Sequence, residues 1–258
     1  MSIATELEAL NTNIKNAYDA IDTKGGTIPQ NKNMVNLPTA IASIPAGGGR
    51  DDNWDKVYSG ETTQVYDGDI TSLRTNALLA SNSSYTYITG IDFPNLIDID
   101  TQAFSGQNRI TNFNLPKLKT INGSSNFSGC SGYTELKLPS LDTLLVSGSQ
   151  YVFQNNTSAI KIDLGNNQTS VTGKFGTNMF RYNSNLKALI LRWNNVAVIS
   201  ASNALSNTGI SSGSGYIYVP SNLVNSYKSA NYWASYPNQI RAIENYSDDG
   251  TVEGNITV

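Results

Sequence analysis

Two pairs of closely spaced carboxylates are the residues of this chain whose types and spacing could do chemistry. Asp67 and Asp69 flank Gly68, and Asp98 and Asp100 are separated by one residue. Paired carboxylates bind calcium or act as the acid and base of a glycosidase. Asp-Gly-Asp is also a turn sequence, and Asp98 and Asp100 lie inside a repeat where polar turn residues are expected. We therefore expect a turn role for both pairs, with calcium binding and glycoside hydrolysis as the weaker alternatives.

The other residues with chemical potential argue against catalysis. The chain has no histidine, so it lacks the usual general base and the commonest metal ligand. Its single cysteine, Cys130, cannot form an intrachain disulfide, and we expect it to be a small buried apolar residue. The Gly-Gly-Gly run at 47–49 does not stand between a strand and a helix, as a phosphate-binding loop does. We predict a protein that is not an enzyme and has no catalytic residues, metal ligands or cofactor.

The composition predicts a folded chain with a weakly charged surface. It has 258 residues, of which 39% are hydrophobic, enough to fill a core. Only 14% are charged, and the net charge of -3 provides no basic field for phosphates. No run of about 18 apolar residues occurs, and the segment MSIATELEAL has neither the basic nor the apolar region of a signal peptide. We therefore expect synthesis in the cytoplasm, without nucleic-acid binding or membrane insertion.

Four similar segments, each followed by a phenylalanine, indicate an internal repeat. The segments are ITGIDFP (88–94), ITNFNLP (110–116), YTELKLP (133–139) and AIKIDLG (159–165). The phenylalanines are Phe104, Phe127, Phe153 and Phe180, which are 23, 26 and 27 residues apart. A period of about 20 to 30 residues is typical of solenoids, in which each repeat buries its apolar face against its neighbours. We predict a β-rich α/β repeat solenoid.

Alternation along the repeat strands separates core-facing side chains from outward-facing ones. The expected core positions are Ile88, Ile91 and Phe93, Ile110, Phe113 and Leu115, Tyr133, Leu136 and Leu138, Ala159, Ile162 and Leu164, and Leu186, Leu189 and Leu191. The outward positions are expected to form an exposed outer row (Asp92, Asn114, Lys137, Asp163, Ile190 and Tyr218) and a second row beside it (Gly90, Asn112, Glu135, Lys161, Ala188 and Tyr216). Our candidate ligand-binding residues are Asp92, Asn114, Lys137, Asp163, Tyr216 and Tyr218. The alternative is a solvated face that only keeps the sheet soluble.

A heptad pattern predicts a coiled-coil-like helix at residues 3–21. Its apolar positions, which we assign to oligomerisation, are Ile3, Leu7, Leu10, Ile14, Ala17 and Ile21. A helix of this length is marginal in water when isolated, so the stripe needs a partner. We favour copies of itself because the stripe is narrow; the alternative is a short helix expected at 33–44. A fibre would suggest a trimer, although the heptads do not select one.

Changes in composition divide the chain into five regions. We expect two short strands at 54–70. Residues 76–78 look like a weak copy of the turn at 102–104. The regions are a helical anchoring module (1–45), a glycine-rich linker (46–52), an N-terminal cap with a first weak repeat (53–87), the solenoid (88–215), and a C-terminal cap and tail (216–258).

Residues 88–243 resemble the BspA-like leucine-rich repeats of bacteria. The resemblance rests on the Leu-Pro strand ends, on Gln102-Ala103-Phe104, on the small-residue segment 124–130 and on the terminal segment with Val219-Pro220 and Trp233. Later repeats depart from the pattern, because Gly165 replaces proline and Leu205 replaces phenylalanine. The resemblance implies a leucine-rich repeat solenoid that binds other molecules.

The first 45 residues resemble the N-terminal module of tail and fibre proteins from phages of Gram-positive bacteria. The matching features are the step from Lys24 to Pro29 and the segment from Leu37 to Ile44. The two resemblances together imply a phage virion structural protein, either a tail-tip or fibre component or a head fibre. Such a protein would contact other virion proteins through its N-terminus and a host-surface glycan or protein through its solenoid. The alternative is a BspA-like adhesin on the bacterial cell surface.

Overall fold

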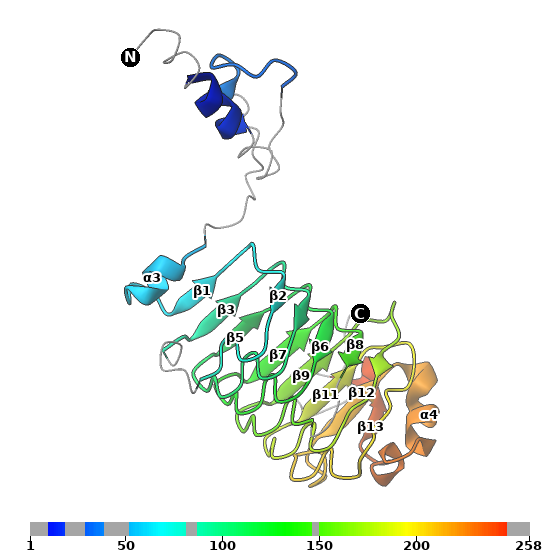
Figure 1. Ribbon diagram of the computed structural model, residues 1–258. Coiled ribbons are helices and arrows are strands. Elements are labelled where there is room, and N and C mark those ends of the chain that lie inside the picture. Colours follow the sequence, from blue (N-terminus) through cyan, green and yellow to red (C-terminus); the bar gives the residue numbers. More distant parts are fainter. Residues whose placement is uncertain (1–9, 19–28, 39–51, 81–86, 146–149, 247–258) are drawn as a thin grey trace. The chain divides into compact units, whose positions relative to one another are not determined.

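The computed structural model describes residues 10–18, 29–38, 52–80, 87–145 and 150–246. The chain divides into two compact units, residues 1–50 and 51–258. The second unit is a stack of short strands and turns (Figure 1), so the predicted repeat solenoid is confirmed. None of the helices in the described ranges combines the length and apolar character needed to cross a bilayer.

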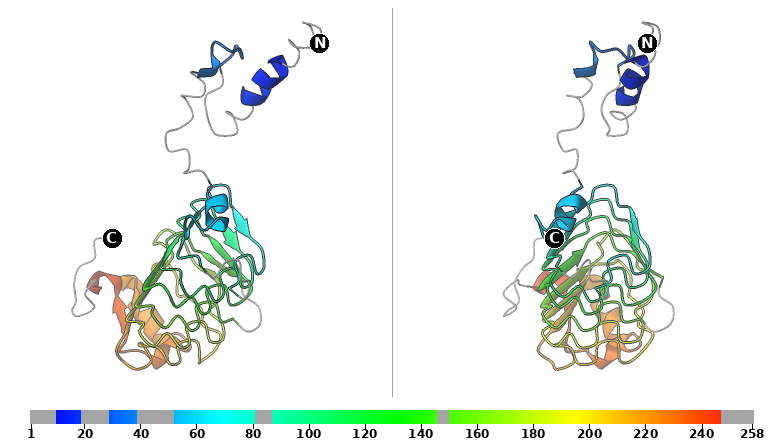
Figure 2. Two further views of the ribbon diagram at one scale, coloured as in Figure 1. Left: turned by 90° about the vertical axis from the view of Figure 1, so that its left-hand side faces the viewer. Right: turned by 60° about the vertical axis from the view of Figure 1, so that its left-hand side comes forward.

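The strands build two layers: each repeat from β1 to β10 contributes one strand to both, whereas β11, β12 and β13 add to the first layer alone. The first-strand layer consists of a three-stranded sheet, β1-β3-β5, and a five-stranded sheet, β7-β9-β11-β12-β13. The second-strand layer is a five-stranded sheet, β10-β8-β6-β4-β2. Strand pairs throughout the described ranges are parallel, as the stacking of identical coils requires (Figure 2).

The strand bounds follow the repeat. The first-strand layer contains β1 (Gln64–Tyr66), β3 (Gly90–Asp92), β5 (Asn112–Asn114), β7 (Glu135–Leu138), β9 (Lys161–Leu164), β11 (Ala188–Leu191), β12 (Tyr216–Val219) and β13 (Ile240–Ala242). The second-strand layer contains β2 (Ser72–Leu73), β4 (Asp98–Ile99), β6 (Thr120–Asn122), β8 (Thr143–Leu145) and β10 (Thr172–Gly173).

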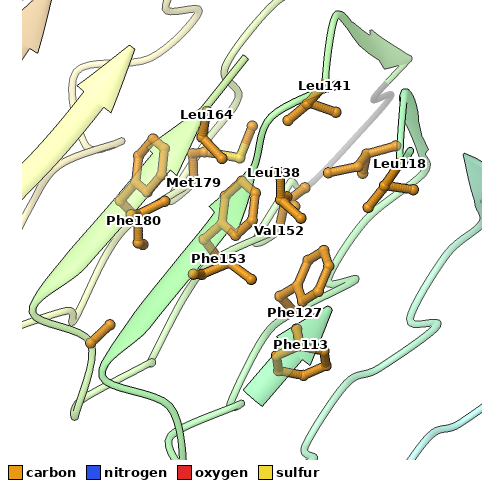
Figure 3. Packing of buried hydrophobic residues seen from close by; sticks show 14 of the residues in the cluster. Phe113, Leu118, Phe127, Leu138, Leu141, Val152, Phe153, Leu164, Met179 and Phe180 are labelled. Atoms are coloured by element: carbon orange, nitrogen blue, oxygen red, sulfur yellow. The ribbon is translucent and has the colours of Figure 1, made fainter. Parts of the chain in front are cut away.

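A column of phenylalanine rings runs through the core (Figure 3). The ring centroids lie 5.2 Å apart for Phe104 and Phe127, 5.5 Å for Phe127 and Phe153, and 5.4 Å for Phe153 and Phe180. Such aromatic pairs contribute about 0.5–1.5 kcal/mol each beyond the burial of their area. The core positions predicted from the strands are all buried, which confirms that assignment.

The turn that follows each phenylalanine needs a residue with positive φ two positions later. Gly106 and Gly129 provide it in early repeats, with φ of 77° and 72°. In later repeats Asn155, Tyr182 and Asn207 take this conformation, with φ of 61°, 65° and 57°. Because a side chain with a Cβ costs roughly 1–2 kcal/mol in the left-handed region, Tyr182 is strained, whereas asparagine tolerates the conformation better.

Buried asparagines connect the turns of neighbouring repeats. Asn183 is fully buried. Its Nδ2 donates to the carbonyl of Phe153 at 2.9 Å, and its Oδ1 accepts from the backbone N–H of Asn156 at 2.8 Å. The abundant asparagines of the sequence therefore satisfy backbone groups that the coil turns leave inside the core.

The N-terminal end of the solenoid differs from the prediction of two strands at 54–70. A helix, α3 (Trp54–Tyr58), occupies the first part, and only β1 is a strand. The indole of Trp54 donates to Asp67 at 2.7 Å. The amide of Asn53 pairs with the edge of β1, donating to the Gln64 carbonyl and accepting from the Tyr66 N–H, both at 2.7 Å. A helix and a side-chain amide thus occupy the edge, where a further strand would have left another edge unpaired.

The segment after β12 closes the other end. It contains η2 (Ser221–Leu223), α4 (Val224–Ser229), η3 (Trp233–Ser235), β13 and η4 (Ile243–Asn245). Tyr227 and Trp233 are buried, and the Trp233 indole donates to the carbonyl of Ala197 at 2.6 Å. The Tyr227 hydroxyl accepts from the Ala197 N–H at 3.0 Å, so both aromatic rings are anchored on the last repeat.

The first unit contains a helix at residues 10–18, which confirms this part of the predicted helix. Tyr18 is fully buried, and its hydroxyl donates to the carbonyl of Asn33 at 2.8 Å. Leu10 is exposed, while Ile14 and Ala17 are half-buried. Three positions of the stripe lie outside the described residues, namely Ile3, Leu7 and Ile21. Residues 39–44 of the second expected helix also lie outside them. The role of the stripe in oligomerisation stays a prediction.

Candidate binding surface

The strand register places the outer-row residues side by side within each sheet of the first-strand layer. Asp92 pairs with Asn114. Lys137 pairs with Asp163, and the row continues through Ile190 and Tyr218 to Arg241. Tyr216 pairs with Ala188 in the second row. The predicted alignment of these residues is therefore confirmed within each of the two sheets.

The part of the outer row on β3, β5 and β7 is open. Asn114 and Lys137 are exposed, and Asp92 is half-buried. The Asn114 amide donates to the Asp92 carboxylate at 2.8 Å. These three candidate residues present amide, carboxylate and ammonium groups to solvent, so they remain available to a ligand.

The part on β9, β11 and β12 is covered, and the predicted exposure of Asp163, Ile190 and Tyr218 is wrong. All three are buried, with residue exposures of 4%, 1% and 5%. Ile243 and Tyr246, which follow β13, pack against Ile190 and Tyr218, and the rings of Tyr218 and Tyr246 are 5.0 Å apart. The segment that covers this face comes from far along the chain.

The second row shows the same covering. Ala188, which was expected on the surface, is buried in the same cluster. Gly90, on β3 and outside that cluster, is buried beside the Gln64 side chain. Tyr216 is half-buried under the guanidinium of Arg241, 3.6 Å from its ring centroid. One sequence signal was missed: Ala188–Leu191 is apolar at four consecutive positions, as in strands covered on both faces.

A groove of about 510 Å³ opens at the carboxyl ends of β7, β9, β11 and β12. Lys137 of the outer row lines it, so the open face leads into it. The residues directly after the strands line it, namely Pro139, Gly165, Arg192 and Pro220. The lining also includes Asn167, Asn194, Asn222, Ile243 and Glu244.

At the groove, β9 and β11 are followed by Gly165 and Arg192, whereas β7 and β12 are followed by Pro139 and Pro220. The register of Leu138, Leu164 and Leu191 places Pro139, Gly165 and Arg192 next to one another. Gly165 has a φ of 76°, and a Cβ there would collide with the buried indole of Trp193. Gly165 is therefore required both by its positive φ and by the Trp193 indole, which fills the place that a Cβ would take. The glycine was visible in the sequence, but its position beside Pro139 and Arg192 required the register.

Asp67 and Asp100 have the local roles expected of turn residues, whereas Asp98 lies in strand β4 and bonds to the neighbouring repeat, so a turn role for Asp98 is wrong. Asp67 Oδ1 accepts from the N–H groups of Asp69 and Ile70 at 3.0 and 3.1 Å. Asp98 accepts from the Ser72 hydroxyl at 2.7 Å, and Asp100 accepts from the N–H of Thr101 at 2.8 Å. Within the described ranges, no cluster of three or more metal-binding side chains occurs.

Cys130 is buried as expected. Its thiol donates to the carbonyl of Phe104 at 3.0 Å. Burial raises the pKa of the Cys130 thiol to about 12, so the neutral thiol is the form present in the folded chain.

Comparison with known proteins agrees with the repeat architecture. Residues 80–210 match the BspA type leucine-rich repeat region in six copies. A crystal structure of a leucine-rich repeat protein from T. pallidum is similar, with 23% identity and a TM-score of 0.42, over 51% of this chain and 60% of that one. This chain thus spans about three fifths of the length of that protein. No curated protein matches the chain. The match over half of its length shows that the chain belongs to the BspA-type leucine-rich repeat family.

Proposed function

We propose that this leucine-rich repeat protein is a phage virion structural protein that attaches to a host surface through its solenoid. Leucine-rich repeat solenoids such as this one typically act as non-enzymatic interaction scaffolds, because stacked repeats present a long continuous surface. The N-terminal unit would contact other virion proteins and copies of itself. The chain would then be localised in the virion.

The observation that carries the binding role is the continuity of the open outer row with the groove. Asp92, Asn114 and Lys137 are accessible on consecutive repeats, and Lys137 also lines the groove. A ligand lying along the row would therefore reach the groove without crossing the covered part of the sheet.

Self-association would strengthen attachment. Leu10, at one of the heptad positions, is 46% exposed, which supports the proposal that the stripe packs against another copy. Several copies held together convert weak individual sites into strong overall binding. A trimer is the state that we favour.

Binding to cells tests the attachment role. Fluorescently labelled full chain is incubated with Gram-positive bacteria, and bound label is measured by flow cytometry. We expect binding by the native chain and loss of most of it after joint Asn114→Ala and Lys137→Ala substitution. Asn225→Ala on α4, an exposed asparagine outside the groove lining, is the matched control. Equal binding by all variants would move the contact away from the outer row.

The second candidate is a bacterial cell-surface adhesin, which the family match itself favours. Immunogold labelling of purified phage particles and of uninfected bacterial cells separates the two. Label on virions supports the first candidate, and label on cell envelopes without phage supports the second.

Light scattering on the full chain measures the oligomeric state, and a monomer at micromolar concentration would contradict the role assigned to the stripe.

A further inference from the structure

We propose that the groove at the carboxyl ends of β7, β9, β11 and β12 binds a short stretch of an uncharged saccharide. This inference rests on the proposed function in that it names the ligand class of the attachment surface. The volume of about 510 Å³ lies within the range of roughly 300–1,000 Å³ that is usual for small-molecule sites.

The groove has the mixed polarity that sugar rings require. Pro139, Pro220 and Ile243 offer C–H surfaces to the apolar faces of a pyranose ring. Asn167, Asn194 and Asn222 are exposed in the lining. Each amide both donates and accepts hydrogen bonds, as do the hydroxyl groups of a saccharide.

The side-chain amides of Asn167 and Asn222 make few hydrogen bonds within the described part of the protein. In the described part of the chain, the Asn222 side chain makes no hydrogen bond, and the only partner of the Asn167 side chain is the Gln168 amide at 3.0 Å. Asn167 follows β9 and Asn222 follows β12, so β11 and Arg192, which follows it, lie between the repeats that carry the two amides. A ligand that spans the groove past Arg192 would contact both.

The charges of the groove balance, which argues for an uncharged ligand. The lining carries two cations, Lys137 and Arg192, and the carboxylate of Glu244. The charge of Arg192 is already neutralised by Asp163, to which it donates two hydrogen bonds. Lys137 and Glu244 then offset each other, so a polyanion would gain no net attraction.

A glycan array of neutral and acidic oligosaccharides, probed with the full labelled chain, tests the ligand class. We expect signals from neutral oligosaccharides. Titration calorimetry with the strongest of them then measures affinity. The joint variant Asn167→Ala, Asn222→Ala should bind about tenfold more weakly, since it removes two hydrogen-bonding groups. Asn225→Ala should bind as the native chain does. Both altered positions are exposed, and thermal melting of each variant checks that it is folded.

Each contrary result has a separate meaning. Signals from acidic oligosaccharides alone would overturn the uncharged class. Equal affinity of the native chain and the joint variant would overturn the groove as the site. Cell binding without any signal on the array would overturn the saccharide while leaving the attachment role standing. Absence of cell binding under the same conditions would instead contradict the proposed function.

Discussion

The guanidinium of Arg192 donates two hydrogen bonds to the carboxylate of Asp163, from Nε to Oδ1 at 2.7 Å and from Nη2 to Oδ2 at 2.9 Å. This geometry joins one repeat to the next beside the groove, which Arg192 lines. Hydrogen bonding to Asp163 raises the pKa of Arg192, against the lowering effect of burial. Asp163 is therefore a structural partner of Arg192, whereas we had selected it as a ligand-binding residue.

Replacing Arg192 with alanine should destabilise the solenoid, because it leaves the buried carboxylate of Asp163 without a partner. We expect a loss of about 3 kcal/mol, at the low end for a broken buried pair, since the Arg192 side chain is still 20% exposed. The free energy of unfolding in urea measures this. The matched control is Lys119→Ala, which removes the more exposed pair with Asp142 and should cost about 1 kcal/mol or less. Equal losses for the two variants would contradict this account.

Replacing Tyr182 with asparagine should stabilise the chain, because asparagine tolerates the φ of 65° at this position better. The relief is partly offset by loss of the contact between the Tyr182 ring and the Arg181 guanidinium, which lies 4.5 Å from the ring centroid. We expect a net gain of about 0.5 kcal/mol, seen as a higher midpoint of thermal unfolding. The reverse change at the equivalent position, Asn155→Tyr, should lower the midpoint. A higher midpoint of thermal unfolding for Asn155→Tyr would show that backbone strain at this turn does not determine the stability difference.

Replacing Asn183 with leucine should be strongly destabilising, although the two side chains are similar in size. The variant leaves the buried Asn156 N–H without its partner, and it removes one of the two side-chain amides that donate to the Phe153 carbonyl, the other being that of Asn156. We expect a loss of about 2–3 kcal/mol in urea unfolding. Asn185→Ala, which removes an exposed amide bonded to the Thr157 carbonyl, should cost about 1 kcal/mol or less. A small loss at Asn183 would mean that water replaces the amide.

Alkaline pH should weaken the fold through Cys130 and Tyr227. Burial raises the pKa of each side chain to about 12, from ordinary values of 9.0 and 10.0. Between the ordinary and raised values the unfolded chain releases a proton that the folded chain keeps. Stability is therefore full below pH 9 and falls as the pH rises toward 12, by about 1.4 kcal/mol per pH unit for each group that titrates.

Unfolding in urea at pH 7, 9 and 10 measures this dependence. Cys130→Ala should make the fall in stability between pH 9 and 10 less steep. In the unfolded chain the thiol, with an ordinary pKa of 9.0, loses its proton at a lower pH than the tyrosines, whose ordinary pKa is 10.0. Parallel curves for the native chain and this variant would show that Cys130 does not contribute.

The repeat and its core were predictable because they depend on local spacing. The phenylalanine column and the alternating strand positions follow from a period in the sequence and from the geometry of a strand, neither of which requires distant contacts. Cys130 and the turn at Asp67 were predicted correctly for the same reason, whereas Asp98 lies in strand β4. The departure from proline at Gly165 was visible in the sequence, although the groove that Gly165 lines was not.

Exposure on the outer face could not be read from spacing, because alternation shows which way a side chain points but not what lies above it. Asp163 and Tyr218 point outward as expected, yet Arg192, Ile243 and Tyr246 cover them. Helix α3 stands where a strand was expected. At the end of the stack a further strand would leave another edge with unpaired backbone groups, and this constraint exists only once the repeats are stacked. The amino-acid pattern thus specified the coil and its core, while the accessible surface and the groove arose from packing between segments far apart in the chain.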